Sequence, residues 1–248
     1  MDIDVWQRRD MGQVEPIAIA KSTNVSMPHQ SASFADRLTA TASDIVKKSA
    51  RPAEDTVGLQ NWTEVEAAVR TCTRCALHES RTQTVFGVGD RNARWMIIGE
   101  APGADEDRQG EPFVGRAGQL LNAMLLAIGL QREQVFIANI LKCRPPNNRD
   151  PKPEEVNCCM AYLQRQIALV NPGIILCVGR IAAQNLLATD APIGKLRGSV
   201  HYLGEQRRPV IVTYHPAYLL RSPGEKRKAW HDLQFAVGTL AALNAAVS

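Results

Sequence analysis

Short, almost entirely apolar segments alternate along the chain with longer segments whose apolar residues recur at helical spacing. The apolar segments lie at residues 94–100, 134–142, 173–179 and 208–216, and each has the length of a buried β-strand. Strands that alternate with helices are joined by right-handed crossovers and form a parallel sheet with helices on both faces. The pattern therefore predicts an α/β protein, a three-layer α/β/α fold around a central four-stranded parallel sheet.

The helical pattern occupies the segments before, between and after these strands. Pro153 and the acidic residues behind it mark one helix start, because proline fits the first turn and acids stabilise a helix N-terminus. Gly129 marks one helix end, because glycine readily adopts the left-handed conformation that ends many helices. We expect five helices, at residues 61–72, 116–130, 152–170, 180–188 and 225–247.

Residues 1–58 differ in character from the rest of the chain. They are rich in Ser, Thr and Ala and show no sustained hydrophobic period. We predict a disordered extension there, with one short helix at 35–47, followed by a folded domain at 59–248. The extension is a candidate contact site for an unidentified protein.

Composition limits the class of protein. Apolar residues make up 45% of the 248 residues, which is enough for a sizeable core. No apolar run approaches the roughly 18 residues of a membrane span, and residues 1–10 lack the apolar centre of a secretory signal. We therefore expect a cytoplasmic protein without membrane contact. We also expect it to be a monomer. A net charge of +4 and a pI near 8.8 permit a polyanionic partner but do not require one.

The six cysteines point to a metal, because cytoplasmic thiols stay reduced and are available as ligands. Cys72 and Cys75 are separated by two residues, a spacing that lets two thiolates hold one metal centre. Cys143 and Cys159 lie 16 positions apart, one after a strand and one within a helix. Four thiolates suit either structural zinc or an iron–sulfur cluster, and the spacing is typical of neither, so spacing alone leaves the metal open.

The two remaining cysteines are expected to have other roles. Cys177 lies inside an apolar strand, where a small buried side chain is a sufficient explanation. Cys158 and Cys159 are adjacent on a helix and point about 100° apart, so we expect only one of them to be a ligand.

Polar residues follow the ends of the predicted strands. Glu100 ends the first strand, Asn139 lies in the second, and His215 follows the fourth. Open α/β sheets bind ligands at the carboxyl ends of their strands, so we expect these side chains to line one cleft. Phe113 borders the same cleft from a glycine-rich loop. That loop matches neither phosphate-binding glycine pattern, and its acidic residues would repel a phosphate.

Three motifs together carry a specific resemblance. They are GEAPG at 99–103 with PFVG at 112–115, KCRPP at 142–146, and HPAYLLR at 215–221. With this order and spacing the chain, from about Cys72 to Leu233, resembles the family-4, iron–sulfur uracil-DNA glycosylases. The resemblance implies the uracil-DNA glycosylase fold and a [4Fe-4S] cluster. It also implies a monofunctional hydrolase for DNA repair, which removes uracil from single- or double-stranded DNA and leaves an abasic site.

Carried over position by position, the resemblance assigns two groups of residues. The cluster ligands are Cys72, Cys75, Cys143 and Cys159, and the family pattern E-E-x-x-x-C selects Cys159 over Cys158. The residues of the uracil pocket are Gly99, Glu100, Ala101, Phe113, Asn139 and His215.

Each pocket role has a physical basis. The base must leave the DNA stack to be reached, and Phe113 offers it a face to stack on. Asn139 can donate to uracil O4 and accept from N3–H, whereas cytosine reverses both groups, so one amide distinguishes the two bases. His215 can donate to O2, where negative charge develops as the glycosidic bond breaks.

The chain departs from better-known uracil glycosylases at two positions. Ala101 replaces an Asp that positions the attacking water, so a carboxylate must come from elsewhere. The candidates are Glu100, Glu106 and Asp107. We expect Glu100 and Glu106 to act in catalysis with His215. Gly103 stands where those enzymes place a Tyr that blocks the thymine methyl group, so the exclusion of thymine is unexplained.

Basic residues gather in the loops at the same edge and are expected to contact DNA phosphates. Those assigned to DNA binding are Arg144, Arg149 and Arg221, and Lys142 lies among them. We expect Leu219 and Leu220 to enter the duplex as a wedge that holds the gap left by the flipped base.

Two other functions are weighed against this one. The first is a non-catalytic iron–sulfur DNA-binding module of a replication protein. The combination of Phe113, Asn139 and His215 argues against it, because a pure binding module needs no uracil pocket. The second is a four-cysteine zinc protein that acts on another small ligand.

Overall fold

The structure is a computed structural model, and it describes residues 61–245. The expected disordered extension at 1–58, its helix at 35–47 and the domain start at 59 lie outside the described residues. No helix within 61–245 is both long and apolar enough to cross a membrane.

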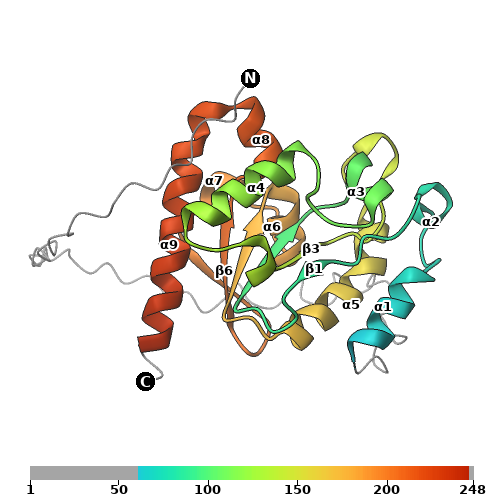
Figure 1. Ribbon diagram of the computed structural model, residues 1–248, viewed down its shortest axis with the longest axis horizontal. Coiled ribbons are helices and arrows are strands. Elements are labelled where there is room, and N and C mark those ends of the chain that lie inside the picture. Colours follow the sequence, from blue (N-terminus) through green and yellow to red (C-terminus); the bar gives the residue numbers. More distant parts are fainter. Residues whose placement is uncertain (1–60, 246–248) are drawn as a thin grey trace, which may run out of the picture. The chain divides into compact units, whose positions relative to one another are not determined.

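A six-stranded mixed sheet lies at the centre of the described domain (Figure 1). In spatial order the strands are β1 (Val88–Gly89), β3 (Phe136–Asn139), β2 (Trp95–Gly99), β4 (Ile174–Val178), β6 (Arg208–Thr213) and β5 (Val200–Leu203). The central four, β3, β2, β4 and β6, are parallel, as the sequence pattern predicts. β1 and β5 pair antiparallel at the two edges.

The sequence pattern does not predict the two edge strands. β1 has only two residues, and the four residues of β5 are all at least partly exposed. An edge strand pairs on one side only and is less covered than a central strand, so it needs no continuous apolar run.

The five predicted helices are confirmed, with boundaries shifted by a few residues. They are α1 (Trp62–Arg70), α4 (Arg116–Ala127), α5 (Pro153–Val170), α6 (Arg180–Leu186) and α9 (Lys226–Ala245). The additional helices are α2 (Leu77–Ser80), α3 (Ala104–Gln109), α7 (Ile193–Leu196) and α8 (Pro216–Arg221), with 3₁₀ turns η2 (Arg132–Gln134), η3 (Pro146–Asn148) and η4 (Pro223–Glu225). These additions have at most six residues, which is too short to show a hydrophobic period.

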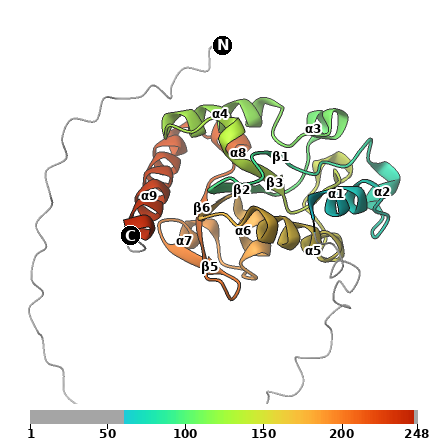
Figure 2. The ribbon, with the colours of Figure 1, turned by 60° about the horizontal axis from the view of Figure 1, so that its bottom comes forward.

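Alternate residues of the sheet face two separate cores. On β2, Met96 and Ile98 pack with residues of α5, α6 and α7, whereas Trp95 and Ile97 pack with residues of α4, α8 and α9. Figure 2 shows these two groups of helices on opposite sides of the sheet. The predicted three-layer arrangement is therefore confirmed, and the loops that follow β2, β3 and β6 leave the sheet at one edge.

Candidate active site

Two neighbouring parallel strands bring Gly99 and Asn139 together at the carboxyl edge of the sheet. A side chain at Gly99 is excluded, because its Cβ atom would lie 2.5 Å from Asn139 Oδ1 and 2.6 Å from the Phe113 ring. The missing side chain lets the amide of Asn139 and the ring of Phe113 pack against the backbone of β2. Three of the residues that the sequence assigns to the uracil pocket therefore lie together.

The amide of Asn139 is buried and incompletely paired. The residue is 2% exposed, and its Oδ1 atom has no hydrogen-bond partner among residues 61–245. Buried polar atoms nearly always have a partner, so an unpaired one indicates a ligand-reading role or a bound water. The backbone beside it is paired in the ordinary way, since the Ile140 amide donates to the Gly99 carbonyl at 2.9 Å.

His215 joins this group from the turn between β6 and α8. Its ring centroid lies 5.6 Å from that of Phe113. The Nδ1 atom accepts a hydrogen bond from the backbone amide of Ala217 at 3.1 Å. Burial lowers the pKa of His215 to about 4, and the Arg221 charge acts in the same direction. At neutral pH the ring is therefore uncharged, and with Nδ1 as the acceptor its proton lies on Nε2.

Phe113 has a strained backbone that Glu106 stabilises. The φ angle of Phe113 is 55°, in the left-handed region that residues with a side chain seldom adopt. The Glu106 carboxylate accepts hydrogen bonds from the amides of Val114 at 3.0 Å and Gly115 at 3.1 Å, and from the amide of Gly103 at 3.1 Å. One carboxylate oxygen of Glu106 therefore holds the loop that presents Phe113, and the other is held by the amide of Gly103 at the start of α3.

Arg132, in η2, holds the same turn. Its guanidinium donates to the carbonyl oxygen of Pro112 at 2.5 Å and to that of Phe113 at 3.3 Å. Gly118, in α4, leaves room for this turn, because a Cβ atom there would lie 1.7 Å from the Phe113 carbonyl oxygen. Sequence reasoning missed Arg132, which lies 19 positions beyond Phe113 and belongs to no motif.

The three candidate carboxylates differ in their surroundings. Asp107 accepts one bifurcated hydrogen bond from the Thr82 amide, which lies 3.0 Å from each carboxylate oxygen, and Glu106 accepts hydrogen bonds from three amides. Within residues 61–245, no hydrogen bond reaches the Glu100 carboxylate, which follows β2 directly. Burial raises the pKa of Glu100 to about 7, and the nearby Asp150 adds to the rise. Glu100 is therefore the carboxylate best suited to exchange a proton near neutral pH.

The predicted ligands Cys72, Cys75, Cys143 and Cys159 come from three separate segments and lie near one another. Burial raises the pKa of Cys75, Cys143 and Cys159, and neighbouring cysteines of the set raise these pKa values further. In the part of the chain that the structure describes, no three His, Cys, Asp or Glu side chains are arranged to hold a single metal ion.

Hydrogen-bond donors face these thiols. Arg81 Nη1 lies 3.1 Å from the sulfur of Cys143. The backbone amide of Lys142 donates to Cys159, and the amide of Leu77 donates to Cys75. Such donors stabilise the thiolate form that binds iron or zinc.

Cys158 and Cys177 have other surroundings. The thiol of Cys158 donates to the Arg74 carbonyl oxygen at 3.2 Å, as a protonated thiol does. Cys177 is 0% exposed inside β4. That neither of them is a ligand stays a prediction.

Comparison with known proteins identifies the family of this chain. Residues 86–234 match the family model of the uracil DNA glycosylase superfamily. The chain belongs to this family. The type-4 uracil-DNA glycosylase of Archaeoglobus fulgidus is 46% identical over 171 residues, which cover 66% of this chain and 86% of that protein. The type-4 enzyme of Thermotoga maritima is 45% identical over 160 residues, which cover 64% of this chain and 82% of that protein.

A type-5 relative is more distant. The type-5 uracil-DNA glycosylase of Thermus thermophilus is 31% identical over 149 residues, which cover 53% of this chain and 68% of that protein. The predicted resemblance to the type-4 enzymes is therefore confirmed, and so is the prediction of a glycosylase. Membership of the family implies DNA repair by removal of uracil.

The residues expected to contact DNA in this glycosylase divide into two groups. Arg221 is exposed, and Arg144 and Leu220 are partly exposed. Leu219, in contrast, is 0% exposed and packs in the core beneath α4 and α9, so the expectation that it enters the duplex is corrected. Arg149 forms a bidentate ion pair with the buried Glu155. The distance from Nη1 to Oε2 is 2.9 Å and that from Nη2 to Oε1 is 2.5 Å, and the pair fixes the start of α5.

Lys142 is the second correction. It is the first residue of the KCRPP motif at 142–146, and the sequence places it among the phosphate contacts. The structure buries it, with 2% exposure, so it cannot reach a phosphate. Its Nζ atom donates instead to the Asn139 carbonyl oxygen at 2.8 Å and to Gln166 Oε1 at 2.7 Å.

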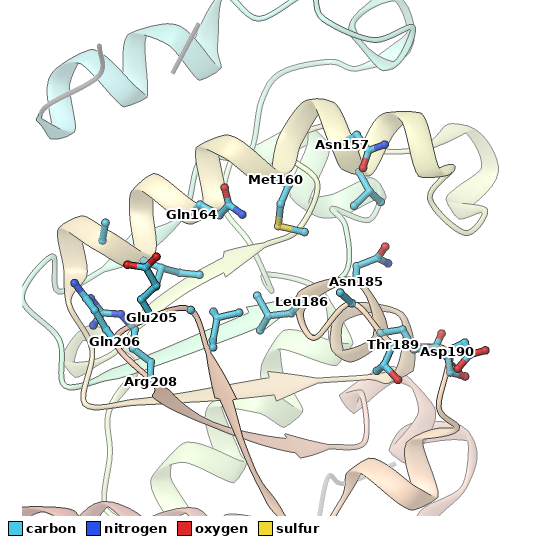
Figure 3. A pocket seen from close by; sticks show the side chains of 17 residues that line it. Asn157, Met160, Gln164, Asn185, Leu186, Thr189, Asp190, Glu205, Gln206 and Arg208 are labelled. Atoms are coloured by element: carbon cyan, nitrogen blue, oxygen red, sulfur yellow. Dashed lines mark hydrogen bonds between the residues drawn. The ribbon is translucent and has the colours of Figure 1, made fainter. Parts of the chain in front are cut away.

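A groove of about 1040 Å³ lies away from these residues of the glycosylase, between α5, α6 and the turn that joins β5 to β6 (Figure 3). Its labelled side chains are amides, aliphatic groups and a few charges, including Gln164, Met160 and Arg208. None of the residues predicted for uracil, DNA or metal lines it. The groove therefore has no part in the site described above.

Proposed function

We propose that this glycosylase binds a uracil flipped out of single- or double-stranded DNA and hydrolyses its N-glycosidic bond, leaving an abasic site. The observation that carries the proposal is the buried Asn139 amide, packed with Phe113 against Gly99, whose Oδ1 atom has no hydrogen-bond partner within residues 61–245. A base inside the duplex cannot reach such a pocket, so the nucleotide must first leave the stack. A monomeric state and a cytoplasmic location stay predictions.

Base recognition would rest on Phe113 and Asn139. The Phe113 ring provides a face for stacking, and its strained turn is held by Glu106 and Arg132. The Asn139 amide would donate to uracil O4 and accept from N3–H. Cytosine presents a donor and an acceptor in the opposite order, and a buried mismatch of this kind costs a few kcal/mol.

His215 would stabilise the leaving uracil. Because Nδ1 is occupied by the Ala217 amide, the Nε2–H group is the donor available to uracil O2. As the bond between N1 and C1′ breaks, its electron pair passes to the base, and the charge on O2 strengthens this hydrogen bond. A neutral ring suits the role, since it donates without having to lose its own proton.

Glu100 would act as the general base for the attacking water. Water forms the new bond to C1′, its proton passes to the Glu100 carboxylate, and uracil departs as an anion. Glu106, expected from the sequence to be catalytic, is better explained as a positioning residue, because its two oxygens are bonded to three backbone amides.

We propose further that Cys72, Cys75, Cys143 and Cys159 hold a [4Fe-4S] cluster. The donor set fits: four neighbouring thiols with hydrogen-bond donors directed at three of them. Such a cluster would supply folding free energy by tying three chain segments together, rather than chemistry at the sugar.

DNA contacts would come from the loops around the pocket. The exposed Arg221 and the partly exposed Arg144 are the best-placed phosphate contacts, and Leu220 is the proposed wedge. Arg149 would serve mainly to fix the start of α5 through Glu155.

One experiment tests the proposed activity. The purified, cluster-loaded protein is incubated with single- and double-stranded oligonucleotides that carry one U, T or C, and the strands are then cleaved with alkali. We expect cleavage at U in both substrates and none at T or C. Intact uracil strands would refute the activity, and cleavage at U in one form only would limit the substrate. A brown protein with broad absorption near 400 nm is expected, and a colourless one that contains zinc would refute the cluster.

A further inference from the structure

Lys142 is a buried lysine for which neither the catalytic proposal nor DNA binding provides a role. Two of its three donor N–H groups are used, by the Asn139 carbonyl oxygen at 2.8 Å and by Gln166 Oε1 at 2.7 Å. Both acceptors are neutral. None of the ion pairs formed within residues 61–245 includes Lys142.

A buried ammonium group without a negative partner is costly, so such groups are almost always paired. Burial lowers the pKa of Lys142 to about 7, and the negative charge of the Cys159 and Cys143 thiols, where they are ionised, acts in the opposite direction. The backbone of Lys142 belongs to the same surroundings. Its amide donates to Cys159, its carbonyl oxygen accepts from Val85 at 2.8 Å, and Cys143 is the next residue.

We propose that Lys142 is a positioning residue. It joins the cysteine cage, formed by Cys72, Cys75, Cys143 and Cys159, to β3, the strand that carries the base-reading residue Asn139. Its Nζ atom holds the carbonyl group of Asn139 at the end of β3 and the side chain of Gln166 on α5, and its backbone amide donates to the cage residue Cys159. This inference rests on the proposed function, because it takes the cysteines as cluster ligands and Asn139 as the residue that reads the base.

Gln166 completes the connection. It lies on α5, the helix that also carries Cys159, and its Nε2 atom donates to the Phe86 carbonyl oxygen at 2.9 Å. Lys142 therefore spans from the cage helix to the pocket strand by hydrogen bonds within one buried region. The cage acts on the pocket through this contact, in addition to stabilising the fold.

The test compares Lys142→Met with Lys195→Met in the full-length, cluster-loaded protein. Lys195 is exposed on α7, so its replacement changes net charge equally without touching the cage. Iron and sulfide analysis confirms the loading, voltammetry measures the reduction potential of the cluster, and single-turnover assays measure uracil excision.

For Lys142→Met we expect a more negative reduction potential, because a nearby positive charge that favours the added electron is lost. We also expect excision to slow by about 10- to 100-fold, the usual effect of a residue just behind the ligands. Lys195→Met should match the parent in both measurements. A loaded Lys142→Met protein with the parental potential and rate would overturn the inference.

A second variant keeps the inference testable if Lys142→Met does not fold. Gln166→Glu is nearly isosteric and gives the ammonium group a carboxylate of its own. We expect a more negative cluster potential with uracil excision retained, and an unchanged potential would overturn the inference. Failure of the parent protein to cut uracil would refute the proposed function instead, so the two failures are distinguishable.

Discussion

At the scale of single residues, the fold sets the protonation states of two pocket residues, His215 and Glu100. The His215 ring is kept neutral, with a pKa of about 4, because burial and Arg221 both oppose its charge. The Glu100 carboxyl has a pKa near 7 because burial and Asp150 oppose its ionisation. One of the two residues therefore changes its charge in the neutral range and the other does not.

The first prediction concerns pH. The base form of Glu100 is lost as pH falls through about 7, while His215 stays neutral until about pH 4. Single-turnover excision should therefore fall about tenfold per pH unit below 7. Glu100→Gln should remove this limb and slow excision by about 10²- to 10⁴-fold. Glu154→Gln, at an exposed position of α5, is the control. A Glu100→Gln enzyme that keeps the parental profile would exclude Glu100 as the base.

The second prediction separates base choice from rate. His215→Ala should slow excision by about 10²- to 10³-fold without changing base preference, because uracil and cytosine share O2. Asn139→Asp should lose uracil activity, since its carboxylate presents two acceptors to the base edge. Single-turnover rates on U- and C-containing strands, with DNA affinity measured alongside, decide between these effects. If Asn139→Ala keeps full activity and selectivity, the base must be read by the backbone around Gly99 instead.

At the scale of elements, the loop between α3 and α4 is held in place by a clamp of two side chains from other parts of the chain, Glu106 and Arg132. Its strained Phe113 turn is held by Glu106 from α3 and by Arg132 from η2, and Gly118 in α4 leaves the space for it. Strain of this kind persists only where the surroundings determine the conformation.

The third prediction tests that clamp. Arg132→Met removes both hydrogen bonds to the carbonyl oxygens of the turn, and leaving such groups unpaired costs about 1–3 kcal/mol in free energy of unfolding. We also expect about tenfold slower uracil excision, because the stacking ring is no longer held. Chemical denaturation and single-turnover kinetics measure the two effects. Arg108→Met, in an exposed ion pair with Asp105, should change neither. Parental stability and rate in Arg132→Met would show that the clamp is unimportant.

At the scale of the whole molecule, the cysteine cage joins segments that local structure does not hold together. Cys72 and Cys75 lie between α1 and α2, Cys143 follows β3, and Cys159 is in α5. A metal centre that binds only the folded arrangement contributes its binding free energy to folding.

The fourth prediction concerns the ligand set. Replacing Cys72, Cys75, Cys143 or Cys159 by Ser should bleach the protein and lower its melting temperature. Cys158→Ser and Cys177→Ser should keep both the colour and the melting temperature. Absorption near 400 nm and thermal melts provide the measurements. A bleached Cys158→Ser protein beside a coloured Cys159→Ser protein would reverse the assignment of the ligand on α5.

The fifth prediction concerns residues 1–58. Because this segment carries no pocket motif and no cage cysteine, its deletion should leave uracil excision on naked oligonucleotides nearly unchanged. Excision rates and thermal melts of the truncated and full-length proteins test this directly. A large loss of activity would show that the segment contributes to the site.

The sequence by itself determined the four parallel strands, the five longer helices and the edge at which the pocket residues gather. The strands and helices are predictable because hydrophobic periodicity is a local property of the sequence. The edge is predictable because the carboxyl ends of parallel strands lie at the same edge of a sheet. The motif residues Gly99, Phe113, Asn139 and His215 could therefore be placed together before any coordinates. The reaction was indicated by the resemblance of the three motifs to those of the family-4 uracil-DNA glycosylases.

Only the tertiary structure decided what each neighbouring residue does. Leu219 and Leu220 are adjacent in a six-residue helix, and packing alone buries the first and exposes part of the second. Lys142 sits in a basic motif yet points into the core, and Arg132 reaches Phe113 across 19 positions. Such roles depend on long-range contacts, which local composition and periodicity do not encode.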